Sequence, residues 1–264
     1  MDWWVGLLVG LLQGVLEWLP VSSSGQSFLF LMGFFPVSIA EALRVGVFLH
    51  FGTLLAVLVK FRGDWFKIFV ELFNRRLTGL TRFLVLASFV SLFFGGLIYL
   101  SVYEAIAALA GELASLLVGL LLVLSGFSLY VSHKRYGEKF THDLGWFEAL
   151  VVGWVQGLSV LPGISRSAVT VSSLLLSDLK PSEALKTSFL LSAPAVLGFI
   201  SAEVFLHGLP ADPDFLLSAT LASFVTGYYS MEALMRFAEK MRFDLFCILF
   251  GLIIALASGL GLLI

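Results

Sequence analysis

Six segments of the chain are apolar over about the length that crosses a lipid bilayer. A helix needs about 20 predominantly apolar residues to span the hydrocarbon core. The segments that meet this condition are, in rough bounds, residues 42–60, 83–102, 112–132, 183–205, 215–234 and 244–263. The pattern therefore predicts an all-α integral membrane protein with six transmembrane helices.

Two further apolar stretches, residues 3–32 and 146–177, are interrupted by polar residues. In each stretch the apolar arms beside the interruption are too short to cross a bilayer comfortably. Irregular backbone at membrane depth is tolerated only where protein or a watery cavity surrounds it. We therefore predict two re-entrant helical hairpins, in which two short helices meet at a polar tip inside the membrane.

The two halves of the chain resemble each other in sequence. The matching segments are Gly10–Ser24 with Gly153–Ser167, with one residue deleted in the second copy, and Glu41–Arg44 with Glu183–Lys186. Each half, residues 1–140 and 141–264, holds one hairpin and three spans. Because three is odd, the halves have opposite orientations. We predict a single membrane domain built as an inverted repeat, a common transporter architecture.

Composition agrees with a lipid environment. Hydrophobic residues make up 59% of the 264 residues and charged residues 13%, whereas soluble domains carry about 25% charged residues. The net charge of −2 gives no information on nucleic acid, but no basic face runs along any segment, so no nucleic-acid partner is expected. The lone Cys247 excludes an intrachain disulfide and a cysteine metal cluster.

Basic residues are distributed unevenly between the predicted loops. Of the 16 Lys and Arg residues, all except Arg44 and Arg166 fall on one side of the predicted topology. The positive-inside rule assigns that side to the cytoplasm. We therefore expect a multi-pass plasma-membrane protein with both termini outside, the first hairpin entering from outside and the second from the cytoplasm.

Each predicted hairpin tip carries a charge that is expensive to bury in a membrane, Glu17 in the first and Arg166 in the second. Gln13 lies four residues before Glu17 and so shares its helical face. A Ser-rich or Gly-rich turn that feeds a helix offers backbone N–H groups to an anion. Arg166 adds a guanidinium suited to phosphate. Two such tips facing each other would hold a diphosphate.

Plainer interpretations exist for these residues. Small residues in membrane helices often serve only close packing. Gln13 and Gln156 are as easily explained by bonds to backbone at the hairpin breaks. His50 lies in the middle of the first predicted span without an evident structural reason, and function and structure are equally open for it.

At these motifs the sequence resembles the undecaprenyl-diphosphate phosphatase family of the bacitracin-resistance type. That family carries Glu/Gln-xxx-Glu, then Pro-x-Ser-Ser-x-Gly-His, and later Pro-Gly-x-Ser-Arg-Ser-x-x-Thr. The corresponding residues are Gln13-Gly-Val-Leu-Glu17, Pro20-Val-Ser22-Ser23-Ser24-Gly25-Gln26 and Pro162-Gly163-Ile164-Ser165-Arg166-Ser167-Ala-Val-Thr170. The resemblance covers essentially the whole chain.

The resemblance implies hydrolysis of a polyprenyl diphosphate to the monophosphate on the outer side of the membrane, which recycles the lipid carrier of surface glycans. It also implies a divalent cation, Mg²⁺ or Ca²⁺, for which we assign Glu17 and Gln13 because hard cations prefer oxygen ligands. Glu17 alternatively activates water. A homodimer remains open. The candidate catalytic residues are Glu17, Arg166, Ser23 and His50, with water preferred to Ser23 as nucleophile; the candidate substrate-binding residues are Gln13, Ser22, Ser24, Gln26, Gly163, Ser165, Ser167, Thr170 and Gln156.

One position departs from the family pattern. The family histidine after the Ser-Ser-x-Gly turn is Gln26 here, and glutamine cannot act as base or nucleophile. The family tends to carry glutamine where this chain has His50. We therefore hypothesise that the imidazole has moved from the tip to the first span, with Gln26 taking the vacated amide role.

Two rival functions share the same architecture. One is a carrier that moves a polyprenyl phosphate across the membrane without cleaving a diphosphate, because inverted repeats with opposing hairpins are typical of transporters. The other is a protein that only sequesters the lipid. Phosphate release from the purified protein separates the phosphatase from both.

Overall fold

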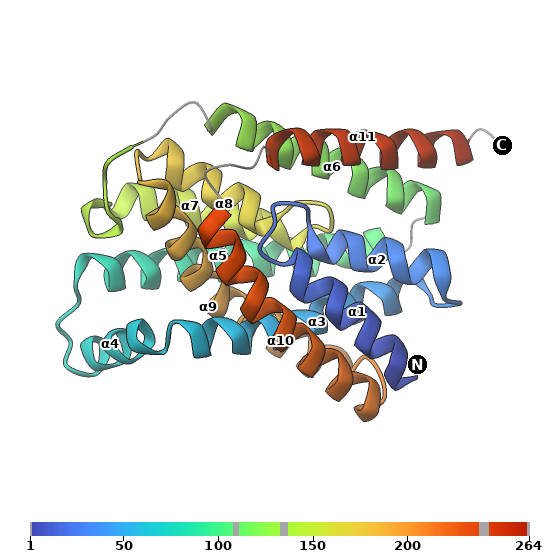
Figure 1. Cartoon of the computed structure of the whole chain (residues 1–264), viewed down its shortest axis with the longest axis horizontal. Coiled ribbons are helices and arrows are strands. Elements are labelled where there is room, and N and C mark those ends of the chain that lie inside the picture. The colour runs from blue at the N-terminus through green and yellow to red at the C-terminus, as the bar shows by residue number, and fades with distance from the viewer. Residues whose placement is uncertain (1, 108–110, 133–136, 238–242, 263–264) are drawn as a thin grey trace.

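The computed structural model describes residues 2–107, 111–132, 137–237 and 243–262. Within these ranges the chain is helical and has no strand, apart from one isolated β-bridge between Lys139 and Leu179 (Figure 1). The predicted all-α class is therefore confirmed. Lys134, Arg135, Lys240 and Arg242 of the predicted cytoplasmic side, and the end of the last predicted span, lie outside the described residues.

The helices follow the predicted segments closely. Their bounds are α1 (Trp3–Leu16), α2 (Ser23–Phe34), α3 (Ile39–Lys60), α4 (Arg62–Phe73), α5 (Gly79–Ala107), α6 (Gly111–Ser132), η1 (Thr141–Asp143), α7 (Trp146–Gly157), η2 (Leu158–Val160), α8 (Arg166–Leu176), α9 (Pro181–His207), α10 (Pro213–Phe237) and α11 (Phe243–Gly261).

Four helices are long and apolar enough to cross a membrane among the residues that are described. They are Ile39–Lys60, Gly79–Val102, Glu112–Ser132 and Pro181–His207, which match four of the six predicted spans. The remaining two segments form α10 and α11 but fall outside this group, so their crossing stays a prediction. Large apolar side chains face outward, with Phe205 88% and Phe89 69% exposed. An apolar exterior of this kind fits a multi-pass membrane protein.

In both interrupted stretches the helix ends at the polar residues and a second helix begins after them. α1 ends at Leu16 and α2 begins at Ser23, whereas η2 ends at Val160 and α8 begins at Arg166. Ser22 is at φ 57°, a left-handed conformation that non-glycine residues seldom adopt. Such backbone strain persists only where the surroundings enforce it, and it concentrates at functional sites.

The short helices pack against different long helices by close backbone approach. α1 lies along α10 and α7 lies along α5. A Cβ added at Gly10 would stand 2.4 Å from the Ala219 carbonyl oxygen, and one added at Gly153 would stand 2.5 Å from that of Ala87. Glycine at these crossings lets the helix backbones touch, as is common in membrane bundles.

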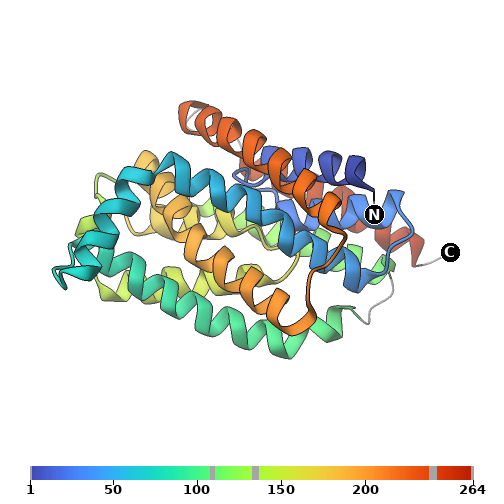
Figure 2. The same ribbon diagram turned by 90° about the horizontal axis from the view of Figure 1, so that it is seen from below.

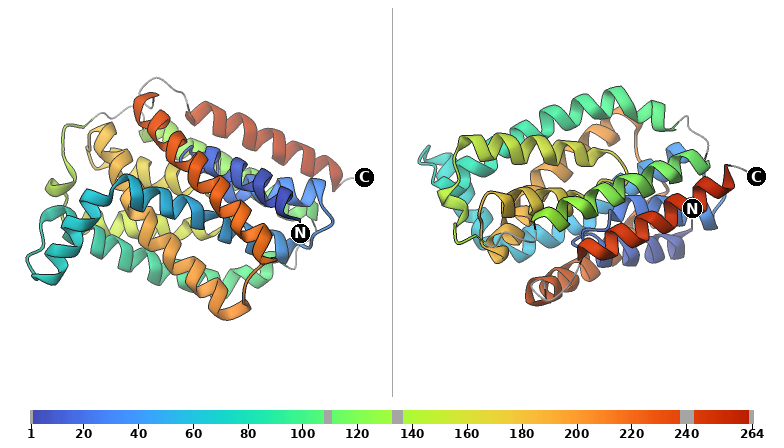
Figure 3. Two further views of the ribbon diagram at one scale, coloured as in Figure 1. Left: turned by 60° about the horizontal axis from the view of Figure 1, so that its bottom comes forward. Right: turned by 90° about the horizontal axis from the view of Figure 1, so that it is seen from above.

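α3 and α9 lie side by side in the middle of the bundle (Figure 2). Lys186 and Asp64 form an ion pair of 2.8 Å at one end of this pair. Arg44 and the buried Glu203 pair at 2.9 Å at the other end. α11 lies along α6 at the periphery (Figure 3). The start of α1 and the end of α11 lie at one end of the molecule, opposite α4 (Figure 1).

Candidate active site

The two helix breaks meet in space although 141 residues separate them. The Gly163 N–H donates to the Ser22 hydroxyl at 3.1 Å, and the Ser167 hydroxyl donates to the Leu19 carbonyl at 3.0 Å. Gly163 is at φ 103°, and a Cβ there would stand 2.7 Å from the Val118 carbonyl oxygen. The contact between the breaks therefore depends on glycine at this position.

Ser22 stands at the N-terminus of α2 but its side chain does not cap that helix. Its hydroxyl is occupied by Gly163 instead. Ser22, Ser23 and Ser24 all line the cavity described below. The first N–H groups of α2 therefore lie at the wall of this cavity. The dipole of α2 favours a negative charge there. In contrast, Ser165 caps α8 in the usual way by accepting from the Ala168 N–H at 3.3 Å.

Glu17 is the centre of the polar contacts. Arg166 Nη2 donates to Oε1 at 2.6 Å. Gln13 Nε2 and Ser23 Oγ donate to Oε2 at 2.5 Å and 2.8 Å. His50 Nε2 lies 3.2 Å from the same Oε2. With 4% of its surface exposed, the carboxylate has exchanged nearly all its water for these partners.

Arg166 connects this carboxylate to the rest of the bundle. Its Nη1 donates to the Ser188 carbonyl at 3.4 Å, and its guanidinium lies 5.8 Å from the centre of the Trp18 ring. Trp18 is itself fixed by donating to the Gly227 carbonyl at 2.7 Å. A guanidinium has five N–H donors in a planar fork. These contacts orient it and leave donors for an anion in the cavity.

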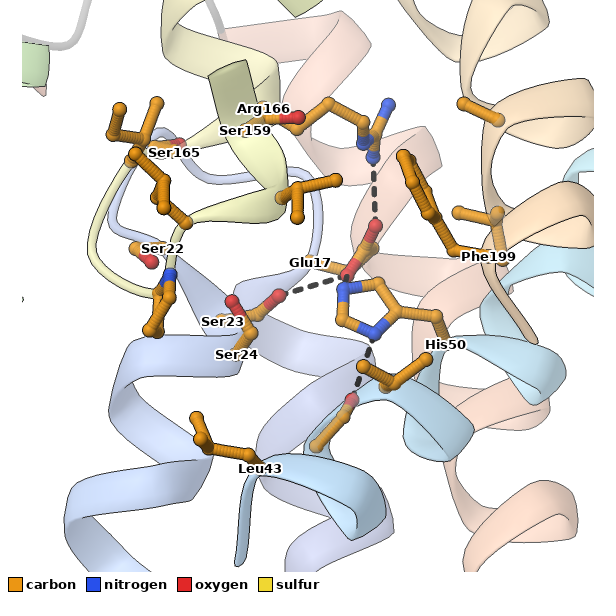
Figure 4. Close-up of a pocket in the computed structure, with 18 of the residues that line it drawn as sticks. Glu17, Ser22, Ser23, Ser24, Leu43, His50, Ser159, Ser165, Arg166 and Phe199 are labelled. Atoms are coloured by element: carbon orange, nitrogen blue, oxygen red, sulfur yellow. Dashed lines mark hydrogen bonds and ion pairs between the residues drawn. The ribbon is translucent and has the colours of Figure 1, made fainter. Parts of the chain in front are cut away.

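His50 lies between a carbonyl and the carboxylate (Figure 4). Its Nδ1 is 2.9 Å from the Gly46 carbonyl oxygen, which can only accept, so Nδ1 carries a hydrogen. An ionised Glu17 at Nε2 then requires a second hydrogen there. The contact is therefore an ion pair only when both ring nitrogens carry hydrogen.

A cavity of about 110 Å³ opens beside these residues. One part of its wall is polar and comes from the two breaks and from His50 of α3. The other part is apolar and comes from α3, α5, η2 and α9. The polar lining includes Glu17, Ser22, Ser23, Ser24, His50, Ser165, Arg166 and Ser167, and the apolar lining includes Leu43, Val47, Ile98, Val160, Leu161, Val196, Phe199 and Ile200. A polar diphosphate with an apolar tail matches this division.

Several predicted site residues stand behind the cavity wall. Gln13 contacts Glu17, and Thr170 donates to the Arg166 carbonyl at 2.6 Å. Gln26 donates to the Val21 carbonyl at 3.2 Å, within its own turn. Gln156 donates to Ser91 at 3.1 Å, and its buried Oε1 has no partner among the described residues. These residues support the two breaks, and Gly163 contributes through its backbone.

The apolar wall was not predicted. Phe199, Ile200 and Ile98 lie in predicted spans whose other residues are equally apolar, so no local signal distinguishes them. Ser159 also lines the cavity and donates to the Gln156 carbonyl at 2.6 Å. In the sequence, only the position of Ser159 beside the second break indicates that it could belong to the site.

Oxygen ligands for a hard cation are few. Across the described ranges, no group of three or more His, Cys, Asp or Glu residues could hold a metal. Glu17 is the one carboxylate on the cavity wall. Mg²⁺ is often held by one or two carboxylates together with substrate phosphates. The residues present therefore fit a cation that arrives with a diphosphate and do not form a preformed all-protein cage.

Comparison with known proteins gives one consistent result. The family model described as bacitracin resistance protein BacA matches residues 6–256. An undecaprenyl-diphosphatase of Methanothrix thermoacetophila is 37% identical over 255 residues, covering 96% of both chains. Proteins of the same name are 34% identical in Saccharolobus solfataricus, over 97% of this chain and 95% of the relative, and 37% identical in Haloarcula marismortui, over 94% of both.

Proposed function

The chain belongs to the BacA family of bacitracin resistance proteins, and we propose that it is a phosphatase that hydrolyses an undecaprenyl-type polyprenyl diphosphate to the monophosphate and phosphate. One observation carries this proposal. Glu17 is held between Arg166 and His50 at the polar side of a cavity whose other wall is apolar. The names of the relatives favour hydrolysis over the carrier and the binding-only protein.

The diphosphate binds through charge and backbone donors. Arg166 offers its remaining donors to phosphate oxygens, a pairing that the planar guanidinium suits well. The uncapped N–H groups of α2 at Ser23 and Ser24 supply neutral donors with the favourable helix dipole. Such fixed donors stabilise the charge that develops during phosphoryl transfer.

Glu17 acts as the base. In the absence of substrate its Oε1 is occupied by Arg166. The diphosphate competes for that guanidinium and so frees Oε1 to take the proton of the nucleophile. The nucleophile then attacks the terminal phosphorus, the bond from that phosphorus to the bridging oxygen breaks, and the prenyl monophosphate leaves. His50 can donate its Nε2 proton to the leaving oxygen.

Two nucleophiles fit this scheme: water, which releases phosphate in one step, or Ser23, whose phosphate bond water must then cleave in a second step. The sequence favoured water because no base was evident beside Ser23. The structure, however, shows the Ser23 hydroxyl donating to Glu17 at 2.8 Å, the spacing of an activated nucleophile and its base. Acid quenching during turnover distinguishes them: phosphorylated Ser23 in the mass spectrum selects the serine, and an unmodified peptide selects water.

A divalent cation belongs to the proposal as a partner of the substrate. Glu17, and Gln13 with its amide turned so that Oε1 faces the carboxylate, would hold it together with diphosphate oxygens. When bound, the ion would neutralise phosphate charge. Gln13 currently donates from Nε2 to Glu17, and the orientation of an amide is assigned from such contacts.

We further propose that the single membrane domain is an inverted repeat of residues 1–140 and 141–264. The equivalent glycines Gly10 and Gly153 cross α10 and α5, which hold corresponding places in the two halves, at nearly equal distances. The breaks after α1 and α7 would be the tips of two re-entrant hairpins. This arrangement explains how two charged tips meet inside a bilayer.

The membrane orientation is likewise proposed. Basic loops would face the cytoplasm and both termini the outside of the plasma membrane. The start of α1 and the end of α11 lie at one end of the molecule, opposite α4, which Arg75 and Arg76 follow, and this placement supports the topology (Figure 1). The membrane and the polyprenyl diphosphate are the partners, and a homodimer remains open.

Phosphate release tests the proposed function directly. Purified protein in detergent is expected to release inorganic phosphate from farnesyl and undecaprenyl diphosphates. Chelator should stop the release, and Mg²⁺ or Ca²⁺ should restore it if the cation proposal holds. No release under any of these conditions contradicts the phosphatase, and transfer of a lipid probe across proteoliposomes would then favour the carrier.

Replacing His50 by alanine is expected to lower kcat about 100-fold, the usual effect of removing a proton donor or acceptor. The reason is the 3.2 Å contact of its Nε2 with Glu17. His142→Ala is the control, because His142 is an exposed residue outside the cavity. Unchanged turnover of undecaprenyl diphosphate in His50→Ala would sink the hypothesis of a displaced imidazole.

A further inference from the structure

One phenylalanine side chain, Phe199, stands in the apolar wall of the cavity. Phe199 of α9 lies at the cavity with its ring on the side of Arg166 and His50 (Figure 4). A Cβ added at Gly95 of α5 would stand 2.4 Å from Phe199 Cζ and 3.3 Å from Val160 Cγ2. The tip of the ring therefore rests on the α5 backbone, beside η2.

Exposed apolar side chains of α5 and α9 lie within two residues of this contact. Leu97 of α5 and Leu197 of α9 are 49% and 54% exposed. A Cβ added at Gly96, the next residue of α5, would meet no atom within 4 Å. The Phe199 ring seated on Gly95 therefore stands where the apolar lining of the cavity meets α5, and both helices carry exposed apolar side chains on their other faces.

A prenyl chain has to leave the cavity by an apolar path. The cavity of about 110 Å³ is far too small to enclose a long prenyl chain, and the two polar breaks cover one side. The path between α3 and α9 is crossed by the ion pair of Arg44 with Glu203, and Tyr99 donates to Glu203 one turn beyond Gly95. An alkyl chain would strip these groups of their partners, which costs free energy.

We propose that the Phe199–Gly95 contact is the lateral portal through which the prenyl chain passes from the cavity into the bilayer. The portal rests on the proposed function, because it assumes a diphosphate at Glu17 and Arg166. The ring moves aside for the chain and packs against the isoprene units beyond the first. Phe199 is thus a specificity-determining residue for long prenyl chains.

Neighbouring glycines provide a matched test. Gly95→Ala places a methyl group against the ring and is expected to raise KM for undecaprenyl diphosphate about tenfold, the effect of disturbing one apolar contact in a substrate pocket. kcat should change little, because Glu17 and Arg166 stay in place. Gly96→Ala adds the same methyl group where there is open space and should leave KM unchanged. Isopentenyl diphosphate, which has no chain beyond the first unit, should not distinguish the variants.

A double variant guards against an effect on folding. Phe199→Ala removes the ring, so adding Gly95→Ala to it should change KM for undecaprenyl diphosphate no further. Non-additivity of this kind identifies two groups that act through one contact. Equal KM values for Gly95→Ala and Gly96→Ala, or full additivity with Phe199→Ala, would overturn the portal. If the wild-type protein releases no phosphate from any diphosphate, the proposed function has failed, which is a different result.

Discussion

Glu17→Gln is expected to lower kcat for undecaprenyl diphosphate by about 1,000-fold, within the range for loss of a general base. Glutamine has nearly the same shape but cannot accept a proton from water or from Ser23. It also places an amide where Arg166, Gln13, Ser23 and His50 all donate or pair. The NH₂ group of the new amide would then face one of these donors. The variant would lose a hydrogen bond in addition to the negative charge.

The measurement is phosphate release at saturating substrate, with the melting temperature in detergent recorded in parallel. Glu112→Gln is the matched control, because Glu112 is exposed and does not line the cavity. A Glu17→Gln variant that remains folded and retains more than a tenth of the wild-type kcat would contradict the role of Glu17 as base.

Arg166→Lys is expected to lower kcat/KM by about 1,000-fold, in the range seen when an arginine that stabilises a phosphoryl transition state is lost. Lysine keeps the positive charge but is a single point donor without the planar fork. The guanidinium of Arg166 contacts both Glu17 and the Ser188 carbonyl. A lysine ammonium cannot hold these two groups and a phosphate oxygen at the same time. Because the same arginine positions Glu17, the loss should appear in kcat as well as in KM.

Arg62→Lys is the control for this substitution. Arg62 is exposed and contacts only the Val59 carbonyl, at 3.4 Å, among described residues. Binding of a non-hydrolysable diphosphate analogue separates the two contributions of Arg166. Weaker binding with unchanged kcat would mean that Arg166 only holds the substrate, and that outcome would refute its part in the transition state.

The charged residues of the site were the easiest to predict. A carboxylate and a guanidinium within apolar segments are costly unless they are paired, and Glu17 and Arg166 do pair at 2.6 Å. The same argument identified His50. It did not reveal that Glu17 lies beside Ser23, because Ser23 follows a break whose path depends on the left-handed turn at Ser22.

Supporting residues were harder to assign. Gln13 and Gln156 occupy matching positions in the two halves, yet Gln13 contacts Glu17 whereas Gln156 contacts Ser91. The second half has Val160 where the first has Glu17, so only one of the two amides has a carboxylate to bind. Gln26 is assigned to the substrate from the sequence, and in the structure its side chain donates to the Val21 carbonyl.

By itself, the sequence determined the helical membrane class, the positions of the two breaks and the charges at their tips. Each of these follows from local physics: apolar length, the cost of buried charge and the turn preferences of serine, glycine and proline. Only the tertiary structure decided which donors surround Glu17 and where the apolar wall at Phe199 and Gly95 stands. Those features depend on contacts between segments far apart in the chain, and in a uniformly apolar span no residue signals in advance which neighbour it will meet.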